Sequence, residues 1–409
     1  MVDINKKILK FYPWLFGLLA LCLPFQTRFL VSVGLRETET IALYAFDLIL
    51  AALLLVSLIF GSKKNWCLAV GWFLAVWLWA ANSMNIQIYW WLRILEAMTL
   101  GYLIYQKREV VFQPIVVGFT FGMLISSFFG VMQIWTQEVG ANKWLGISGQ
   151  LPWQPGASVL ETLAGRLLRG YGIFPHPNIF GGLSAFAIIL FLSVKQSLPD
   201  WLKSKYIFLA VIAILLIGLW SSFSRSAWLG LIFGLAILIY QKKIPIRLIL
   251  WIAALAVLLN GIWYQFSLDR VMLNNRLEKK SLIDRVVALE TAKTIVQSHP
   301  WLGVGLGNFS TAAESVLKNH DPRYIEPVHN VYALVVGELG IVGVLIIVLL
   351  VVRGFYRLDT WAYPILVTIL IIGFFDHYWW SITSARLAVA LVIALSIRPK
   401  KTTQPALID

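Results

Sequence analysis

Residues 331–352 read VYALVVGELGIVGVLIIVLLVV, an apolar stretch in which Glu338 is the single charged residue. At about 1.5 Å per residue, a helix of this length crosses the roughly 30 Å hydrocarbon core of a bilayer. The stretch has no alternation of polar and apolar residues, which disfavours a strand of a membrane β-barrel. It therefore predicts a membrane-spanning α-helix.

Runs of the same kind recur along the 409-residue chain, of which 59% is hydrophobic and 13% charged. A soluble domain has about 25% charged residues, so a soluble globular protein, a disordered chain and a disulfide-framed module are excluded. We predict an all-α polytopic membrane protein with about twelve transmembrane helices. The predicted spans are residues 12–30, 41–60, 66–84, 86–105, 111–135, 179–194, 206–222, 226–241, 246–267, 331–352, 362–376 and 378–397.

The orientation follows from Lys and Arg in the short connections. One alternating set of connections holds 18 of these residues, and the opposite set holds only Arg28, Arg36, Arg225 and Arg386. Cytoplasmic loops carry the excess of basic residues, so both termini are predicted to be cytoplasmic. Two long polar segments then lie outside, at residues 136–178 and 268–330.

This topology divides the chain into five parts. They are an N-terminal five-helix membrane region (1–135), an outer loop (136–178), membrane helices six to nine (179–267), a long outer loop (268–330), and helices ten to twelve with a cytoplasmic tail (331–409). Within the long outer loop, residues 281–297 predict an amphipathic helix, because apolar residues recur along one stripe. The glycine-rich residues 301–307 predict a tight turn against the membrane surface.

The charge and cysteine content narrow the possible partners. A net charge of +14 is typical of proteins that bind nucleic acid, anionic lipid or a phosphorylated substrate. The long outer loop is itself basic, which indicates either a phosphate-bearing partner or attraction to anionic headgroups. Cys22 and Cys67 both lie in apolar runs, so neither a disulfide framework nor a cysteine-based zinc site is expected.

Three residues of the outer segments are candidates for chemistry. His329 ends the long outer loop where the tenth span begins, and its ordinary pKa near 6.5 suits proton transfer at neutral pH. The alternative is a histidine that only caps or hydrogen-bonds. Arg225, in a short outer turn, and Arg285, on the amphipathic helix, can each bind a phosphate. Their alternatives are a headgroup contact and a solvated helix face.

Four other polar residues are candidates for supporting groups. They are His176, Glu326, Asn330 and Glu338. His176 has a structural alternative, since it precedes a proline that starts a helix. Inside the predicted membrane region, Arg93 and Glu96 are spaced to pair on one helix face, and Asp47 is a further partner.

The outer segments contain neither an Asp-x-Asp pair nor a His/Cys cluster with metal spacing. No nucleotide-binding loop is found on the cytoplasmic side. We therefore predict no metal and no other cofactor.

Four groups of motifs follow one another in a fixed order. They are HPNIFGG at 176–182, SRSAWLG at 224–230, Arg285 followed by HPWLGVGLGNF at 299–309, and HNVY at 329–332 with ELGIVG at 338–343. In this order and topology, residues 174–345 resemble the O-antigen ligase/polymerase superfamily. The resemblance implies a glycosyltransferase C-like helical membrane fold, with a periplasmic helical loop over a cavity.

The resemblance also implies an activity and its residues. A glycan would pass from undecaprenyl diphosphate to a hydroxyl, by inversion and without metal or nucleotide, on the periplasmic face of the bacterial inner membrane. His329 would activate the acceptor hydroxyl, and Arg225 and Arg285 would hold the diphosphate. We expect an O-antigen ligase whose acceptor is lipid A–core; an O-antigen or exopolysaccharide polymerase of the same superfamily is the alternative. The partners would be the lipid-linked donor, the acceptor and membrane lipids, but no nucleic acid.

A rival hypothesis from another class is a transporter or flippase of polysaccharide intermediates. Arg93, Glu96 and Asp47 keep it open, because ionisable residues inside a membrane often mark a transport pathway. Such transporters are commonly built from repeated halves with a site at the midplane. The two halves of this chain are unlike, and its long polar segments lie outside in the predicted topology.

Overall fold

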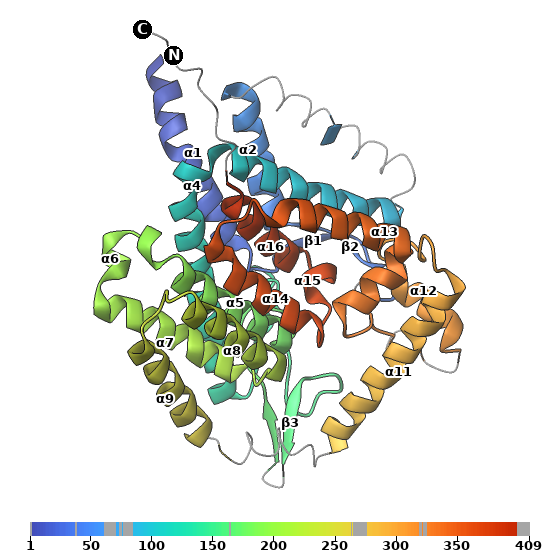
Figure 1. Ribbon diagram of the computed structural model, residues 1–409. Helices are drawn as coiled ribbons and strands as arrows, with labels where there is room; N and C mark the ends of the chain where they lie inside the picture. The colour runs from blue at the N-terminus through green and yellow to red at the C-terminus, as the bar shows by residue number, and fades with distance from the viewer. Residues whose placement is uncertain are drawn as a thin grey trace.

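The computed structural model describes residues 2–36, 39–60, 71–72, 76, 85–162, 165–262, 264, 276–318, 321 and 325–398. Within these residues the fold is predominantly helical (Figure 1). The longer helices are α1 (Val2–Cys22), α2 (Ala45–Phe60), α4 (Ile86–Thr136), α5 (Pro177–Ser193), α7 (Lys205–Ser221), α8 (Arg225–Tyr240), α9 (Ile246–Ile262), α11 (Arg276–Ser298), α13 (Val331–Phe355), α14 (Tyr363–Gly373) and α16 (Thr383–Ser396). Shorter ones are η2 (Lys195–Ser197), α6 (Asp200–Lys203), α12 (Phe309–Val316), η4 (Thr360–Ala362) and α15 (Tyr378–Ser381).

Helix α5 forms the centre of the core. Every residue from Pro177 to Ser193 is buried, and α4, α7, α8 and α14 pack around it. Small residues let these apolar helices approach closely. A Cβ atom on Gly218 of α7, for example, would lie 2.2 Å from Ser127 Oγ of α4. The start of α5 is therefore held rigidly, which matters because His176 and Asn178 lie there.

Among the described residues, two helices are long and apolar enough to cross a bilayer, α4 and α13. Helix α13 contains the stretch at 331–352, and only 17% of its most apolar window is buried, so lipid is the natural cover for the rest. Eight further apolar helices of the described residues have 10–17 residues. The helical fold is thus confirmed, while the twelve crossings and the outward position of the long loops stay predictions.

The predicted boundaries need correction in several places. The first span does not reach residue 30: α1 ends at Cys22, next to a turn that includes Pro24, and Arg28–Ser32 forms strand β1, paired with β2 (Ile41–Tyr44). The second span therefore begins as a strand. The break predicted between the fourth and fifth spans is confirmed, by contrast, because α4 consists of two helices that join at a kink at Lys107 (φ −123°, ψ 17°). The twelfth is divided at the extended residue Ile382. Residues 66–84 lie outside the described residues, apart from three positions.

The expectation of an all-α fold is also corrected by a second hairpin. Strands β3 (Val159–Thr162) and β4 (Gly165–Leu168) pair in the segment 136–178. The amphipathic helix predicted at 281–297 is confirmed as α11, which starts earlier, at Arg276. Arg276 Nη2 lies 3.7 Å from Glu161 Oε1 of β3, so the two segments predicted to lie outside meet.

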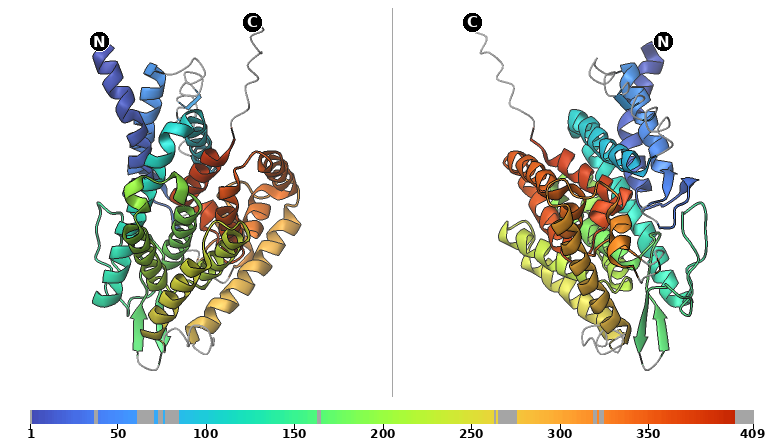
Figure 2. Two further views of the ribbon diagram at one scale, coloured as in Figure 1. Left: turned by 60° about the vertical axis from the view of Figure 1, so that its left-hand side comes forward. Right: turned by 90° about the vertical axis from the view of Figure 1, so that its right-hand side faces the viewer.

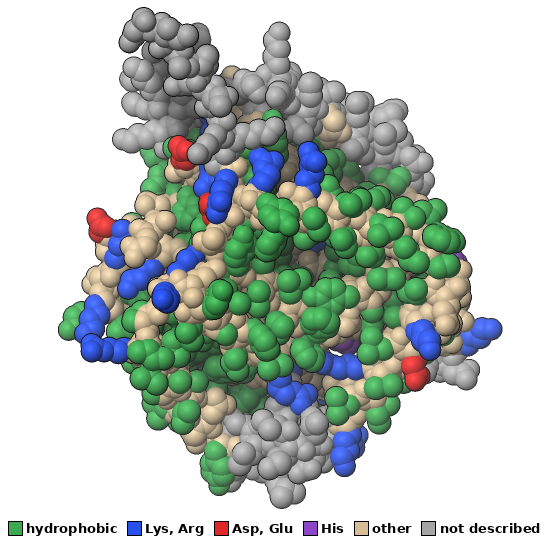
Figure 3. Space-filling view, in the orientation of Figure 1, with side chains coloured by type: hydrophobic (Ala, Val, Ile, Leu, Met, Phe, Trp, Pro, Cys, Tyr) green, Lys and Arg blue, Asp and Glu red, His purple; other side chains and the backbone are tan. Residues whose placement is uncertain are grey.

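The molecule has two distinct ends (Figures 1 and 2). The β3–β4 hairpin and the start of α11 lie at one end, and α1 begins toward the other. At that second end Asp359 pairs with Arg108 (3.0 Å) and Arg398 (2.9 Å). Figure 3 shows a row of basic side chains near this end, above a broad apolar surface. The sidedness predicted from the short connections stays a prediction.

Candidate active site

Asp376, in the turn that follows α14, is the centre of a buried polar cluster. Its carboxylate accepts hydrogen bonds from Asn178 Nδ2 (3.3 Å) and Ser226 Oγ (2.9 Å). Its Oδ1 also lies 3.6 Å from His329 Nδ1, an ion-pair distance. Only 5% of the Asp376 side chain is exposed. One carboxylate thus connects the start of α5, the start of α8 and the segment that precedes α13.

Three helices begin at this cluster, each with a capped N-terminus. His176 Nδ1 accepts a hydrogen bond from Asn178 N (3.1 Å), Ser224 Oγ accepts one from Ala227 N (3.4 Å), and Asn330 Oδ1 accepts one from Ala333 N (2.9 Å). Asn330 Nδ2 also donates to the carbonyl of Phe374, two residues before Asp376 (3.1 Å). Helix N-termini carry partial positive charge, so their convergence favours anions here.

His329 lies between two carboxylates and is 29% exposed. Its Nε2 is 3.5 Å from Glu326 Oε2, and its Nδ1 faces Asp376. Burial disfavours the charged imidazolium, but Asp376 and Glu326 outweigh it and raise the pKa of His329 to about 9. In return, His329 holds the pKa of the largely exposed Glu326 at about 2. His329 is therefore mainly protonated at neutral pH, unlike a histidine with the ordinary pKa of 6.5.

Two other histidines of the cluster have the opposite character. The ring of His377 lies 5.2 Å from that of His329, and burial together with the His329 charge lowers the pKa of His377 to about 4. Burial and the nearby Arg169 lower the pKa of His176 to about 3. His377 Nδ1 shares a hydrogen bond with Ser381 Oγ (2.6 Å), and His176 Nε2 shares one with Ser158 Oγ (2.9 Å). Both are neutral imidazoles beside a cation.

The two arginines singled out in the sequence approach the cluster from different helices. Arg225 is the first residue of α8, next to the Ser226 that binds Asp376. Arg285 lies half-buried on α11, and its positive charge stabilises the Asp376 carboxylate. In the part of the chain that the structure describes, no group of three His, Cys, Asp or Glu residues is placed to hold a metal ion.

Residues 208–348 match the family model described as O-antigen ligase. The match supports the resemblance of the chain to the O-antigen ligase/polymerase superfamily. The resemblance seen in the motifs is thereby confirmed, and with it a glycosyltransferase-type membrane protein. The matched segment includes Arg225, Arg285, Glu326 and His329, whereas His176 and Asp376 lie outside it. None of the curated proteins compared with the chain matches it.

Sequence reasoning missed Asp376, His377 and Arg169 as residues of this site. Asp376 was placed at the end of the eleventh span, although an Asp-His pair between two apolar runs is a warning sign, because ionisable groups are expensive in a membrane. Arg169 carries no comparable signal. It donates from Nε to the carbonyl of Ser222 (2.8 Å) and from Nη2 to Asn178 Oδ1 (2.6 Å).

Glu338 takes part in a different contact. Its carboxylate accepts a hydrogen bond from Trp380 Nε1 (2.8 Å), and its carbonyl accepts one from Gly305 N (2.9 Å). The predicted turn at 301–307 packs here against α13, which kinks at Gly340 (φ +63°). Only glycine fits at this position, because a Cβ on Gly340 would lie 2.3 Å from the carbonyl oxygen of Trp301. Glu338 thus anchors the glycine-rich turn on α13.

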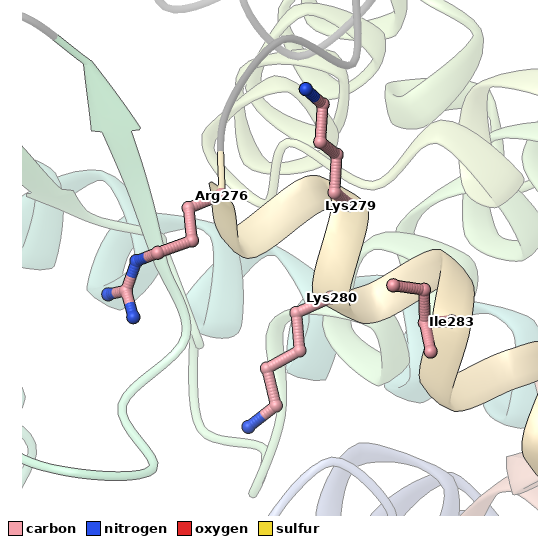
Figure 4. Close-up of a pocket in the computed structure, with 4 residues that line it drawn as sticks. All are labelled: Arg276, Lys279, Lys280 and Ile283. Atoms are coloured by element: carbon pink, nitrogen blue, oxygen red, sulfur yellow. The ribbon is translucent and has the colours of Figure 1, made fainter.

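Three basic residues at the start of α11 line an open cleft of about 490 Å³ (Figure 4). Arg276, Lys279, Lys280 and Ile283 form it, and the three cationic side chains point in different directions. Ile283 of this cleft lies two residues before Arg285, whose charge acts on Asp376. The cleft therefore adjoins Arg285 along α11.

The ion pair expected inside the predicted membrane region is confirmed. Arg93 Nη1 lies 2.9 Å from Asp47 Oδ1 and 2.8 Å from Glu96 Oε2. The guanidinium also packs over the rings of Tyr44 and Tyr89, with its Cζ 5.2 and 5.1 Å from their centroids. These contacts join the start of α2 to the start of α4.

Proposed function

We propose that this protein transfers a glycan from undecaprenyl diphosphate to an acceptor hydroxyl on the periplasmic face of the inner membrane, as an O-antigen ligase that acts on lipid A–core. The observation that carries the proposal is a buried carboxylate that His329 faces, that the charge of Arg285 reaches and that Ser226, next to Arg225 at the start of α8, binds, in a chain whose residues 208–348 match the O-antigen ligase model. Such a cluster combines groups that hold a diphosphate with a group that moves a proton.

The donor diphosphate would be held by Arg225 and Arg285. A guanidinium is permanently charged and can bind phosphate through two parallel hydrogen bonds, so the pair offsets the negative charge that develops as the glycosidic bond breaks. The N-terminus of α8, which begins at Arg225, adds partial positive charge at the same place. The lipid tail would lie along the apolar surface of the membrane helices.

The acceptor hydroxyl would lose its proton to His329. The hydroxyl oxygen attacks the anomeric carbon, the bond from that carbon to the diphosphate oxygen breaks, and the configuration inverts. The proton on His329 gives an imidazolium, which Asp376 and Glu326 are placed to stabilise. A positioned general base typically contributes about 10²–10⁴-fold to a rate.

This assignment has a consequence for pH. With a pKa of about 9, only about 1% of His329 is neutral at pH 7. The rate should therefore rise with pH until it levels off near pH 9. The two carboxylates make His329 a stronger base, but they also lower the fraction of His329 that is neutral and able to accept a proton.

The experiment is a transfer assay with the full-length protein in detergent. An undecaprenyl-diphosphate glycan is incubated with lipid A–core, or with a second lipid-linked glycan, and products are separated on a gel. A product on lipid A–core supports the ligase, and a longer lipid-linked glycan indicates the polymerase. His329→Gln should abolish either product. The matched control is His299→Gln, because His299 is exposed at the end of α11.

An active His329→Gln variant would remove the base from the mechanism. If the wild-type protein gives no product with either acceptor, the transferase proposal is wrong. Movement of the donor across sealed vesicles would then favour the transporter hypothesis.

A further inference from the structure

The turn that carries Arg225 has an unusual backbone. Helix α7 ends at Ser221 and α8 begins at Arg225, so the chain reverses direction within three residues. Phe223 in this turn has a backbone φ of +48°, a value that residues other than glycine rarely adopt, and its side chain is buried. Such a conformation persists only where the surroundings over-determine it. The contacts that hold the turn therefore decide where Arg225 lies.

Two successive residues of the 136–178 segment supply such contacts. Gly170 N donates to the carbonyl of Ser221 (2.8 Å), and Arg169 Nε donates to the carbonyl of Ser222 (2.8 Å). A side chain at Gly170 would not fit, because its Cβ would lie 2.7 Å from Ser221 Oγ. Arg169 itself is only 4% exposed, so its bond to Ser222 is shielded from water.

The same guanidinium also contacts the residue that binds Asp376. Arg169 Nη2 donates to Asn178 Oδ1 (2.6 Å), which leaves Asn178 Nδ2 to donate to Asp376 Oδ1 (3.3 Å). Because the amide oxygen is engaged by Arg169, the orientation of Asn178 is fixed. A planar guanidinium can make these two bonds in fixed directions at once, whereas the single nitrogen of lysine cannot reproduce that fork.

We propose that Arg169 is a positioning residue of the transferase, which fixes the turn that aims Arg225 at the donor diphosphate and orients Asn178 on Asp376. The inference rests on the proposed function for its first part, the aim of Arg225. Its second part, the link through Asn178 to Asp376 and His329, concerns the resting protein and needs no substrate. Arg169 touches neither the donor nor the acceptor in this scheme.

The first test is a double-mutant cycle on donor kinetics. Arg169→Lys should raise the donor KM by about tenfold or more, because a displacement of about 1 Å in a binding group can cost 10²-fold. Arg225→Lys should do the same, and the double variant should be no worse than Arg225→Lys alone, since both changes remove one interaction. Arg166→Lys, on the exposed part of strand β4, is the matched control.

The second test follows the titration of His329 without any substrate. Diethyl pyrocarbonate modifies neutral imidazole, so the modification rate of His329 against pH, read by mass spectrometry, gives its pKa. Asn178→Ala removes a hydrogen-bond donor from Asp376, so the carboxylate should attract the His329 imidazolium more strongly. The pKa of His329 should therefore rise. The other titratable and charged groups around His329 are Asp376, Glu326, His377 and His176, and Arg285 acts on Asp376. None of them is replaced in this test.

The outcomes separate the two parts. Losses that multiply in the double variant, or an Arg169→Lys variant with wild-type KM, would overturn the positioning of Arg225. An unchanged His329 titration in Asn178→Ala would overturn the link to Asp376, and this arm stands even if Arg169→Lys does not fold. If the wild-type protein transfers nothing, the proposed function fails, while the titration still tests the second part.

Discussion

Replacing Asp376 by Asn tests the centre of the site with one atom changed. The pKa of His329 rises from 6.5 to about 9, which corresponds to roughly 3 kcal/mol in favour of the imidazolium. Burial acts in the opposite direction, so the two carboxylates contribute more than this net value. Asp376 is 5% exposed and Glu326 is 71% exposed, so water screens Asp376 less, and its share should be the larger one. We expect Asp376→Asn to lower the pKa of His329 by at least about one unit.

The kinetic effect has two components with opposite signs. In the wild type, kcat/KM should rise almost tenfold per pH unit up to about pH 9, where His329 becomes neutral. In Asp376→Asn the rise should end at a lower pH, because the imidazolium has lost a carboxylate. The plateau should be at least about tenfold lower, since the same carboxylate orients the base and stabilises the charge that forms on it. At pH 7 the larger neutral fraction partly offsets this loss.

The measurement is initial transfer rate at low donor concentration between pH 6 and 10, with detergent-solubilised protein. Asp359→Asn is the control, because Asp359 is likewise an ion-paired aspartate, here half-buried, and lies at the other end of the molecule. Its profile should keep the wild-type shape. Identical profiles for Asp376→Asn and the wild type would refute the role of Asp376, and a wild-type profile that is flat from pH 6 to 9 would refute His329 as the base.

Three further predictions concern the arginines, the membrane ion pair and the topology. Arg225→Lys and Arg285→Lys should each lower kcat/KM for the donor by about tenfold or more, because lysine keeps the charge but loses the bidentate fork; full activity in both would leave them a headgroup-binding role. Arg93→Met should destabilise the fold by roughly 3–5 kcal/mol, because it leaves Asp47 and Glu96 without their cation, and an unchanged thermal midpoint would contradict this. A cysteine at the exposed Lys318 should react with an impermeant thiol reagent in intact spheroplasts; reaction only after lysis would reverse the predicted orientation.

The local features of the fold were predictable from the sequence, because they depend on short-range patterns. Apolar runs indicated the helices, and the stripe at 281–297 indicated α11. The limits of the helices were not predictable to the same extent. Hydropathy does not register that Arg28–Ser32 pairs with a second strand, since the middle of β1, residues 29–31, is apolar like the helix before it. The break at Lys107, by contrast, was predictable, because Lys107 and Arg108 interrupt the apolar run there.

The candidate site was predictable only in part, for a related reason. His329, Arg225 and Arg285 were found because each stands out as a polar group at a predicted boundary. Asp376 was overlooked because the aromatic residues around it make it read as the end of a span. Its role depends on contacts with Asn178 and Ser226, which lie 198 and 150 residues away in the sequence. No local pattern records such distances.

The charges of the site suggest how its two halves work together. Asp376 and Glu326 raise the affinity of His329 for a proton, whereas Arg285, whose charge reaches Asp376, opposes them. A bound diphosphate would neutralise the arginines and add negative charge nearby, so His329 would become a stronger base when the donor is present. The rise of kcat, which reports the donor complex, should then lie at a higher pH than the rise of kcat/KM, which reports the free protein. Departure of the diphosphate would reverse the effect and help His329 to release the proton that it has taken.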